Sequence, residues 1–272
     1  MSDWIHGLPV VWMGVVIFGL TYLATAVLYL IVLFLSRHER ARSLKNVSPG
    51  MLSPLGVLFG LFVAFTAVQV WSDNDRATEA VDREASSLKA VLVLSSALPA
   101  ESQQRLHDLI ASHVENAVTH EWPMMAHRDA TLTMTPEHLA EALQLTLAFN
   151  PSTAGQTAAQ REMATALENA FDARRQRILI SRIQVSFFKW ACLFMQAACI
   201  LFAIGLLHCD NRLSAGLAMG VFASGMAVCF LLIAGYDRPF VGQYMVRPDP
   251  LLQVLPDQAP ITQGMPAAAS RN

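Results

Sequence analysis

Four long stretches of the chain contain no charged residue, and they constrain the fold more than any other feature of the sequence. Residues 4–36, 46–72, 190–209 and 213–236 hold no Asp, Glu, Lys or Arg. Each stretch is long enough to cross the hydrocarbon core of a bilayer, which takes about 20 apolar residues in a helix. The N-terminus lacks the basic residues of a signal peptide. We therefore expect a multi-pass protein of the cell membrane with four retained transmembrane helices.

The charged residues gather between the second and third stretches. Residues 73–189 hold 26 of the 40 charged residues, although only 15% of the chain is charged. This pattern predicts transmembrane helices one and two with a short basic loop at 9–72, a helical soluble domain at 73–186, and transmembrane helices three and four at 187–236. A proline-rich, mostly disordered tail is predicted at 237–272. The net charge of −2 argues against a nucleic-acid partner.

Two long segments without Gly or Pro cross the predicted membrane borders. Residues 61–98 and 156–204 contain neither residue type. A helix over the first segment would measure about 57 Å, nearly twice the roughly 30 Å of the hydrocarbon core. The prolines at 99, 123, 136 and 151 divide the rest of the middle segment into short helices. We predict an all-α fold in which the second and third transmembrane helices extend into a helical stalk.

One stripe on the second transmembrane helix suggests a pore. At 100° per residue, a narrow stripe is formed by Phe62, Phe65, Gln69, Asp73 and Arg76. If several copies of the helix surrounded an axis, the stripe would be an apolar constriction that opens into a charged vestibule, as ion channels use. The alternative is an ordinary bundle helix with its aromatic residues in the core. These five residues are the candidate pore lining.

Two further groups of residues suggest contacts. Gly216, Gly220 and Ser224 are four residues apart on the fourth transmembrane helix, a spacing that lets another helix approach closely. Arg174, Arg175 and Arg177 precede the third transmembrane helix, where they would either bind anionic lipid headgroups or act as a topology signal.

Nothing in the sequence selects an enzyme, a cofactor or a metal. Zinc sites on helices use tight spacings such as i,i+4, and no pair among the middle-segment histidines has it. Those histidines are His107, His113, His120, His127 and His138. The chain has no phosphate-binding glycine loop, and its transmembrane stretches carry no Asp, Glu, Lys or Arg of the kind that marks intramembrane chemistry. We expect no catalytic site, no cofactor and no metal.

Several short motifs resemble a known family. The segment after the last transmembrane helix resembles the acid-x-Pro-Phe-Gly motif of bestrophin anion channels, with Val241 inserted; it comprises Asp237, Pro239, Phe240 and Gly242. The second transmembrane helix is similar to its bestrophin counterpart at Pro54, Gly60, Val63, Trp71, Asp75, Arg76, Glu79 and Ala80. With the Glu-Trp-Pro run at 121–123, the pattern over residues 11–250 most resembles the bestrophin-like family of membrane proteins.

That resemblance implies a pentameric anion channel whose second transmembrane helices line the pore. It also implies that the soluble domain and both termini are cytoplasmic. The basic residues alone leave the orientation open, because the raw count near the membrane ends favours this side and the dense short loop favours the other. The pore register is open too: matching through Pro54 and Gly60 places the neck at Val57 and Leu61, and matching through Asp75 places it towards Phe65 and Val68.

The chain differs from the calcium-sensing bestrophins in one respect that bears on gating. The run of acids that follows Pro-Phe-Gly in calcium-sensing bestrophins is missing, because only Asp249 and Asp257 follow Gly242. Calcium needs six to eight oxygen ligands, so calcium gating at this place is not expected.

The alternative function is a non-conducting membrane scaffold or sensor that couples the helical domain to the membrane.

Overall fold

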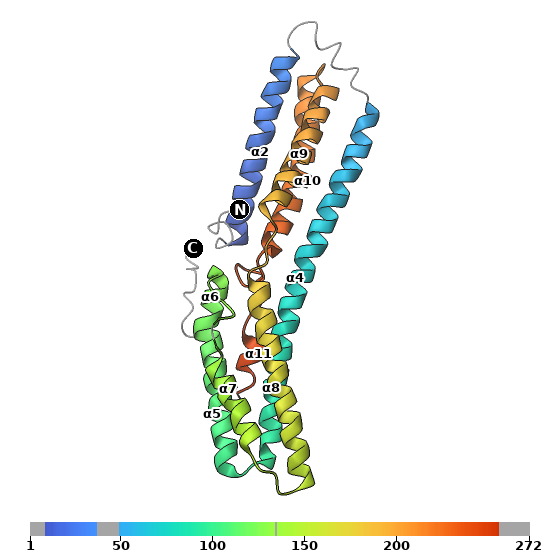
Figure 1. The fold of residues 1–272 in the computed structure, drawn as a ribbon. Coiled ribbons are helices and arrows are strands. Elements are labelled where there is room, and N and C mark those ends of the chain that lie inside the picture. The colour runs from blue at the N-terminus through green and yellow to red at the C-terminus, as the bar shows by residue number, and fades with distance from the viewer. Residues whose placement is uncertain (1–8, 37–48, 134, 256–272) are drawn as a thin grey trace. The chain divides into compact units, whose positions relative to one another are not determined.

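Every regular element that the computed structural model describes is helical (Figure 1). The model describes residues 9–36, 49–133 and 135–255. The longer helices are α2 (Val10–Leu35), α4 (Leu52–Leu94), α5 (Ala100–Asn116), α7 (Glu137–Ala148), α8 (Ala154–Ser181), α9 (Phe187–Leu207) and α10 (Arg212–Tyr236). Short elements are η1 (Pro49–Met51), η2 (Ser95–Ala97), the π-helical turn η3 (Ala117–Glu121), α6 (Trp122–His127) and α11 (Asp249–Leu252). The predicted all-α fold class is confirmed.

The chain divides into two compact units. Unit 1 comprises Met1–Arg76 and Ile183–Val246, and unit 2 comprises Ala77–Arg182 and Arg247–Asn272. Helix α4 runs through both units without a break for 43 residues, as its lack of Gly and Pro after Gly60 predicts. The basic loop at 37–45 and residues 256–272 of the predicted tail lie outside the described residues.

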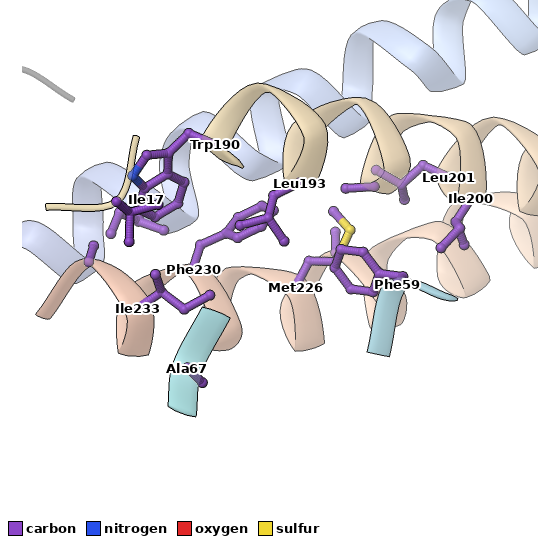
Figure 2. Packing of buried hydrophobic residues seen from close by; sticks show 14 of the residues in the cluster. Ile17, Phe59, Ala67, Trp190, Leu193, Ile200, Leu201, Met226, Phe230 and Ile233 are labelled. Carbon is purple, nitrogen blue, oxygen red and sulfur yellow. The ribbon is translucent and has the colours of Figure 1, made fainter. Parts of the chain in front are cut away.

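Unit 1 holds the helices that can cross a membrane. Four helical segments are long and apolar enough, and they are α2, α4 with its short extension to Ala97, α9 and α10. Helix α10 packs against both α2 and α9. Figure 2 shows the core where α9 and α10 meet, with Trp190, Leu193 and Phe230 packed together and Phe59 and Ala67 of α4 joining them. These five residues are all buried.

Unit 2 is built from α5, α6, α7, α8 and the distal part of α4. Helix α7 packs between α5 and α8. The amide nitrogen of Gln160 donates to the carbonyls of Thr146 and Phe149 at 2.9 and 2.7 Å, and so satisfies acceptors that the end of α7 leaves unpaired. Helix α5 buries an apolar face here through Leu106, Leu109, Ile110 and Val114.

The third transmembrane helix is not continuous with the helix before it. We expected one helix over residues 156–204, but α8 ends at Ser181 and α9 begins at Phe187. Side chains replace the missing helical hydrogen bonds: the Val185 amide donates to the Asp237 carboxylate at 2.5 Å, and Ser186 caps α9 by accepting from the Lys189 amide. The absence of Gly and Pro therefore did not suffice to predict continuity.

Residues 237–255 were expected to belong to a disordered tail, and that expectation does not hold for them. The Val246 amide donates to the Pro239 carbonyl at 2.7 Å, which closes a turn after α10. Phe240 and Val246 are buried, and so are Leu251 in α11 and Val254 just after it. Apolar side chains at these positions explain why the prolines around them do not prevent folding.

Among the glycines that the structure describes, Gly205 of α9 leaves the least room for a side chain. A methyl group at this position would lie 2.9 Å from Cγ2 of Val32 and 3.1 Å from Sδ of Met219. Val32 is buried, and its β-branched side chain has few rotamers with which to move away.

We predict that Gly205→Ala lowers the free energy of unfolding by about 1–3 kcal/mol, the usual cost of overpacking. The matched control is Gly220→Ala in α10, where nothing lies within 4 Å of the added methyl group. Thermal unfolding of both variants in detergent measures the difference. Equal melting temperatures for the two variants would contradict the close packing described here.

Candidate functional site

Helix α4 has two faces of opposite character along its whole length. With 3.6 residues per turn, one face lies within about 40° of Val57 and recurs every turn over about 54 Å. Its members are all exposed, and they are Val57, Leu61, Ala64, Val68, Trp71, Asp75, Glu79, Asp82, Ser86, Lys89 and Val93. We call this the open face. The opposite side is buried at Phe59, Thr66, Val70, Asp73, Ala77, Glu84, Leu88 and Val91.

The predicted pore stripe falls between these two faces. It is rotated by about a third of a turn from the open face. Phe62 packs against the unit 1 core, and Lys189 donates a hydrogen bond from Nζ to Oε1 of Gln69. Asp73 is buried and lies 3.7 Å from the guanidinium of Arg76. Of the five candidates, only Phe65 and Arg76 are exposed, at the edge of the open face.

Small residues lie among the exposed side chains of α4. A methyl group added at Gly56 or Gly60 would meet nothing within 4 Å, and Ala64 follows on the open face. The exposed side chains of α2 are mostly large, as at Trp12, Leu20, Leu23, Leu30 and Phe34. Large apolar side chains suit lipid, whereas small ones let neighbouring helices approach.

Unit 2 contains a buried cluster of charges that we call the ion network. It joins four elements through Glu84 of α4, His113 of α5, Glu121 of η3, and Arg174 and Arg177 of α8. Arg177 is fully buried and donates from Nε to Glu84 at 2.8 Å and from Nη2 to Glu121 at 2.8 Å. Arg174 donates to the other Glu121 oxygen at 2.8 Å, and Nε2 of His113 lies 2.9 Å from Glu84.

Aromatic packing completes the surroundings of Arg177. Its guanidinium carbon lies 4.7 Å from the centre of the Trp122 ring, within the range of a cation–π contact. The π-helical turn η3 ends at Glu121, immediately before Trp122. A π-turn changes the direction of the residues that follow it. The Glu-Trp-Pro run therefore supplies both a carboxylate and a ring to the same arginine.

The charges of the ion network are balanced. Two carboxylates face two guanidinium groups, so the cluster is neutral when His113 is neutral. Burial acts to raise the pKa of Glu84, but Arg177 and His113 outweigh it and hold this pKa at about 2. Burial likewise acts against ionisation of Glu121, and Arg177 and Arg174 lower its pKa. Both carboxylates are therefore charged at neutral pH. The charge-free part of α4 ends at Ser72, so Glu84 lies beyond its membrane-spanning part.

The ion network corrects the lipid contact predicted for the three arginines. Arg174 and Arg177 are buried in ion pairs, so their charges are not available to headgroups. Only Arg175 is exposed. The three arginines lie close together in the sequence, which suggested a single basic patch. On a helix, Arg174 and Arg177 lie on the same face and Arg175 lies on a different one.

The segment after α10 contains the predicted acid-x-Pro-Phe-Gly motif and forms a turn. Asp237 accepts from the Val185 amide, as described above, and Pro239 and Phe240 are buried in the turn. Gly242 has φ 90°, a conformation that residues with a side chain rarely adopt. The spacing with the inserted Val241 is thus compatible with the glycine serving as a turn residue.

The predicted small-residue stripe on α10 contacts α2 of the same chain. A Cβ placed on Gly216 would lie 4.0 Å from the ring of Tyr29. The Ser224 hydroxyl lies 2.7 Å from the Tyr22 hydroxyl. A Cβ placed on Gly220 would meet nothing within 4 Å. The stripe therefore serves helix packing inside unit 1 at two of its three positions.

Comparison with known proteins identifies the family of this chain. A family model described as Bestrophin-like domain matches residues 9–251. The chain belongs to the Bestrophin-like family. A search of curated proteins finds no match. The Bestrophin-like chain has the fold of a bacterial bestrophin homologue from Klebsiella pneumoniae: one variant of that protein superimposes with a TM-score of 0.69 at 11% identity, covering 87% of this chain and 96% of the other.

Other solved structures agree with this one. A second crystal structure of the Klebsiella pneumoniae homologue gives a TM-score of 0.66 at 11% identity, over 86% of this chain and 94% of the other. A structure described as a membrane protein gives 0.68 at 12% identity, over 87% and 95%. Identities this low establish the fold. Together with the four apolar helices, they identify a membrane protein.

The sequence did not single out Glu84, and it gave His113 and Glu121 no role as partners of the arginines. A signal for Glu84 was present, because it interrupts an otherwise apolar face of α4 formed by Ala77, Val81, Leu88 and Val91. A charged residue in the middle of such a face needs a buried partner. His113 likewise lies on the apolar face of α5. The identity of the partners, 29 to 93 residues away, required the tertiary structure.

We predict that Arg177→Met lowers the free energy of unfolding by about 3–5 kcal/mol, because it leaves two buried carboxylates with Arg174 as their one remaining guanidinium. Chemical unfolding in detergent measures this. The control is Arg105→Met, which removes an exposed pair with Glu141 at 2.6 Å and should cost about 1 kcal/mol or less. Equal losses for both variants would contradict the role given to burial.

The lowered pKa values of Glu84 and Glu121 predict acid sensitivity. A carboxyl group whose pKa is lower in the folded protein stabilises it fully above the unfolded value, 4.5 for Glu84, and this stabilisation fades as pH falls towards 2. Melting temperatures between pH 2 and 7 measure the loss. Glu84→Gln should flatten the curve below pH 4.5, and a curve with the wild-type slope would contradict the prediction.

Proposed function

We propose that this chain forms an oligomeric ion channel in which α4 lines the pore. The observation that carries the proposal is the open face of α4, which no other part of the described chain covers over ten helical turns. Family membership supports it, because the bestrophins that this family resembles are ion channels. In an oligomer the open faces would surround an axis, with apolar rings at Val57, Leu61 and Val68 and polar ones beyond Ser72.

The proposed pore lining differs from the stripe read from the sequence. Phe62, Gln69 and Asp73 make contacts inside their own subunit, so we place the open face, rather than these residues, towards the axis. This choice agrees with the register obtained by matching Pro54 and Gly60, in which Val57 and Leu61 form the neck. Phe65 and Arg76 would lie at the contacts between neighbouring copies of α4.

The resemblance to bestrophins also suggests the oligomeric state and the orientation of the chain in the membrane. We propose a homo-oligomer, a pentamer by likeness to the bestrophins, with unit 2 and both termini in the cytoplasm. The small residues Gly56, Gly60 and Ala64 support close contacts between copies of α4. Arg175, the exposed member of the arginine cluster, is the one that we propose for contact with anionic headgroups.

The ion class has two candidates. Likeness to bestrophin anion channels favours anions. The acids of the open face favour cations, because Asp75 and Asp82 make no ion pair or hydrogen bond with the residues that the structure describes, and Lys89 is the one base on this face. Glu79 on the same face is paired with Arg83 at 2.5 Å. Rings of carboxylates select cations in channels.

A non-conducting scaffold or sensor is the alternative function. It would be supported by dimers that form through Gly216 and Gly220. Ser224 is already hydrogen-bonded to Tyr22 of α2, whereas Gly216 is exposed and remains open to such a contact. A dimer of this kind would leave the open face of α4 uncovered, and this is the reason we prefer the channel.

We predict that the purified protein in liposomes carries an ionic current and that Leu61→Ser increases it, because a polar side chain eases the wetting of an apolar constriction. The matched control is Leu20→Ser, a leucine of α2 that is 58% exposed, against 50% for Leu61, and is not part of the proposed pore lining. Planar-bilayer recording measures both. Current unaffected by either variant would contradict the assignment of α4, and folded oligomeric protein without current would favour the scaffold.

The reversal potential in a potassium chloride gradient decides the ion class. If Asp75 and Asp82 face the pore, the wild-type potential lies on the potassium side and moves towards zero in the double variant Asp75→Asn/Asp82→Asn. A wild-type potential on the chloride side that the double variant does not move would instead support anion conduction, as the resemblance implies.

A further inference from the structure

The ion network lies on the side of α4 directly opposite to the open face. Glu84 is 27 residues from Val57, a rotation of half a turn at 100° per residue. It is also half a turn from Asp75 and close to half a turn from Asp82. The one carboxylate on the buried side of α4 in unit 2 is therefore held in a fixed direction, and that direction sets where the open face points.

The contacts of Glu84 resist rotation of α4 about its own axis. Both carboxylate oxygens are engaged, Oε2 by Nε of Arg177 at 2.8 Å and Oε1 by Nη2 of Arg177 at 3.2 Å and Nε2 of His113 at 2.9 Å. A bidentate pair of this kind fixes the direction as well as the distance of its partner. Arg177 is itself fixed by Glu121 and by the ring of Trp122.

The apolar neighbours of Glu84 on α4 do not give the same directional constraint. Leu88 and Val91 are fully buried, but apolar packing is not directional. A turned helix with a buried, unpaired carboxylate would be strongly disfavoured. The residues around Glu84 thus make one rotational setting of α4 much more favourable than the others.

We propose that the Glu84–Arg177 pair is the rotational anchor of α4 and so positions the pore-lining face. The inference rests on the proposed function for the meaning of that face, but the rotation itself can be measured without it. Helix α4 is one uninterrupted helix from Leu52 to Leu94, so a rotation at Glu84 is transmitted along the backbone towards Val68. Glu84 and Arg177 act as positioning residues and do not touch the permeating ion.

The test compares two neighbouring positions on opposite faces of α4. Val93 is 66% exposed and Val91 is 0% exposed, and both lie beyond the charge-free part of α4. Each is replaced singly by cysteine in the full-length protein in liposomes, and its reaction rate with a neutral, water-soluble thiol reagent is read by mass spectrometry. With the anchor intact, Val93→Cys reacts and Val91→Cys does not.

Removal of the anchor is then introduced as Glu84→Met/Arg177→Met. The double change keeps the charge balance, because Arg174 and Glu121 remain as a pair. We expect the ratio of the two rates, Val93→Cys over Val91→Cys, to fall by a factor of roughly 5–30, the range that loss of an ordinary net interaction gives. Glu84→Gln, which keeps the shape of the side chain, should lower the ratio in the same direction.

The matched control is Arg105→Met/Glu141→Met, which removes an exposed ion pair of the same unit that does not involve α4. It should leave the ratio unchanged. A ratio unchanged by the loss of Glu84 and Arg177 would overturn the inference even if the protein conducts. A ratio that falls in a protein without current would support the anchor and refute the proposed channel, so the two failures are distinguishable.

Discussion

The continuity of α4 is the constraint on which the other features depend. A single helix of 43 residues belongs to both units, and its opposite faces meet different surroundings along its whole length. One side is buried against its own subunit, first by the aromatic core of unit 1 and then by the helices of unit 2. Because a helix cannot twist one end independently of the other, the direction fixed at Glu84 and the direction of Leu61 are not independent.

The buried charges of unit 2 are costly, and their arrangement explains how the cost is offset. Taking ions out of water is unfavourable unless geometry and additional hydrogen bonds compensate. In the ion network each carboxylate oxygen has a donor, and the number of guanidinium groups equals the number of carboxylates. Such a cluster adds directional specificity that an apolar core of the same volume would lack. A hydrophobic replacement would keep α4 buried but would no longer determine which residue faces outwards.

Much of the fold could be predicted from the sequence, because charge-free stretches and runs without Gly or Pro are local signals. They predicted the four transmembrane helices and the long α4. The break between α8 and α9 could not be predicted, because it depends on Asp237, which is 52 residues from Val185. The same holds for Arg174 and Arg177, whose role as buried partners depends on Glu84 and Glu121. The periodicity of α4 indicated an asymmetric helix, but it could not show that Phe62 packs against the unit 1 core or that Gln69 accepts from Lys189, because these contacts involve distant parts of the sequence.

The most direct test of the account is a structure of the full-length protein in lipid nanodiscs by electron cryo-microscopy. The account predicts a closed ring of copies with α4 around a central axis and with Val57, Leu61 and Val68 facing that axis. A monomer, or an assembly in which this face of α4 lies against lipid, would contradict it.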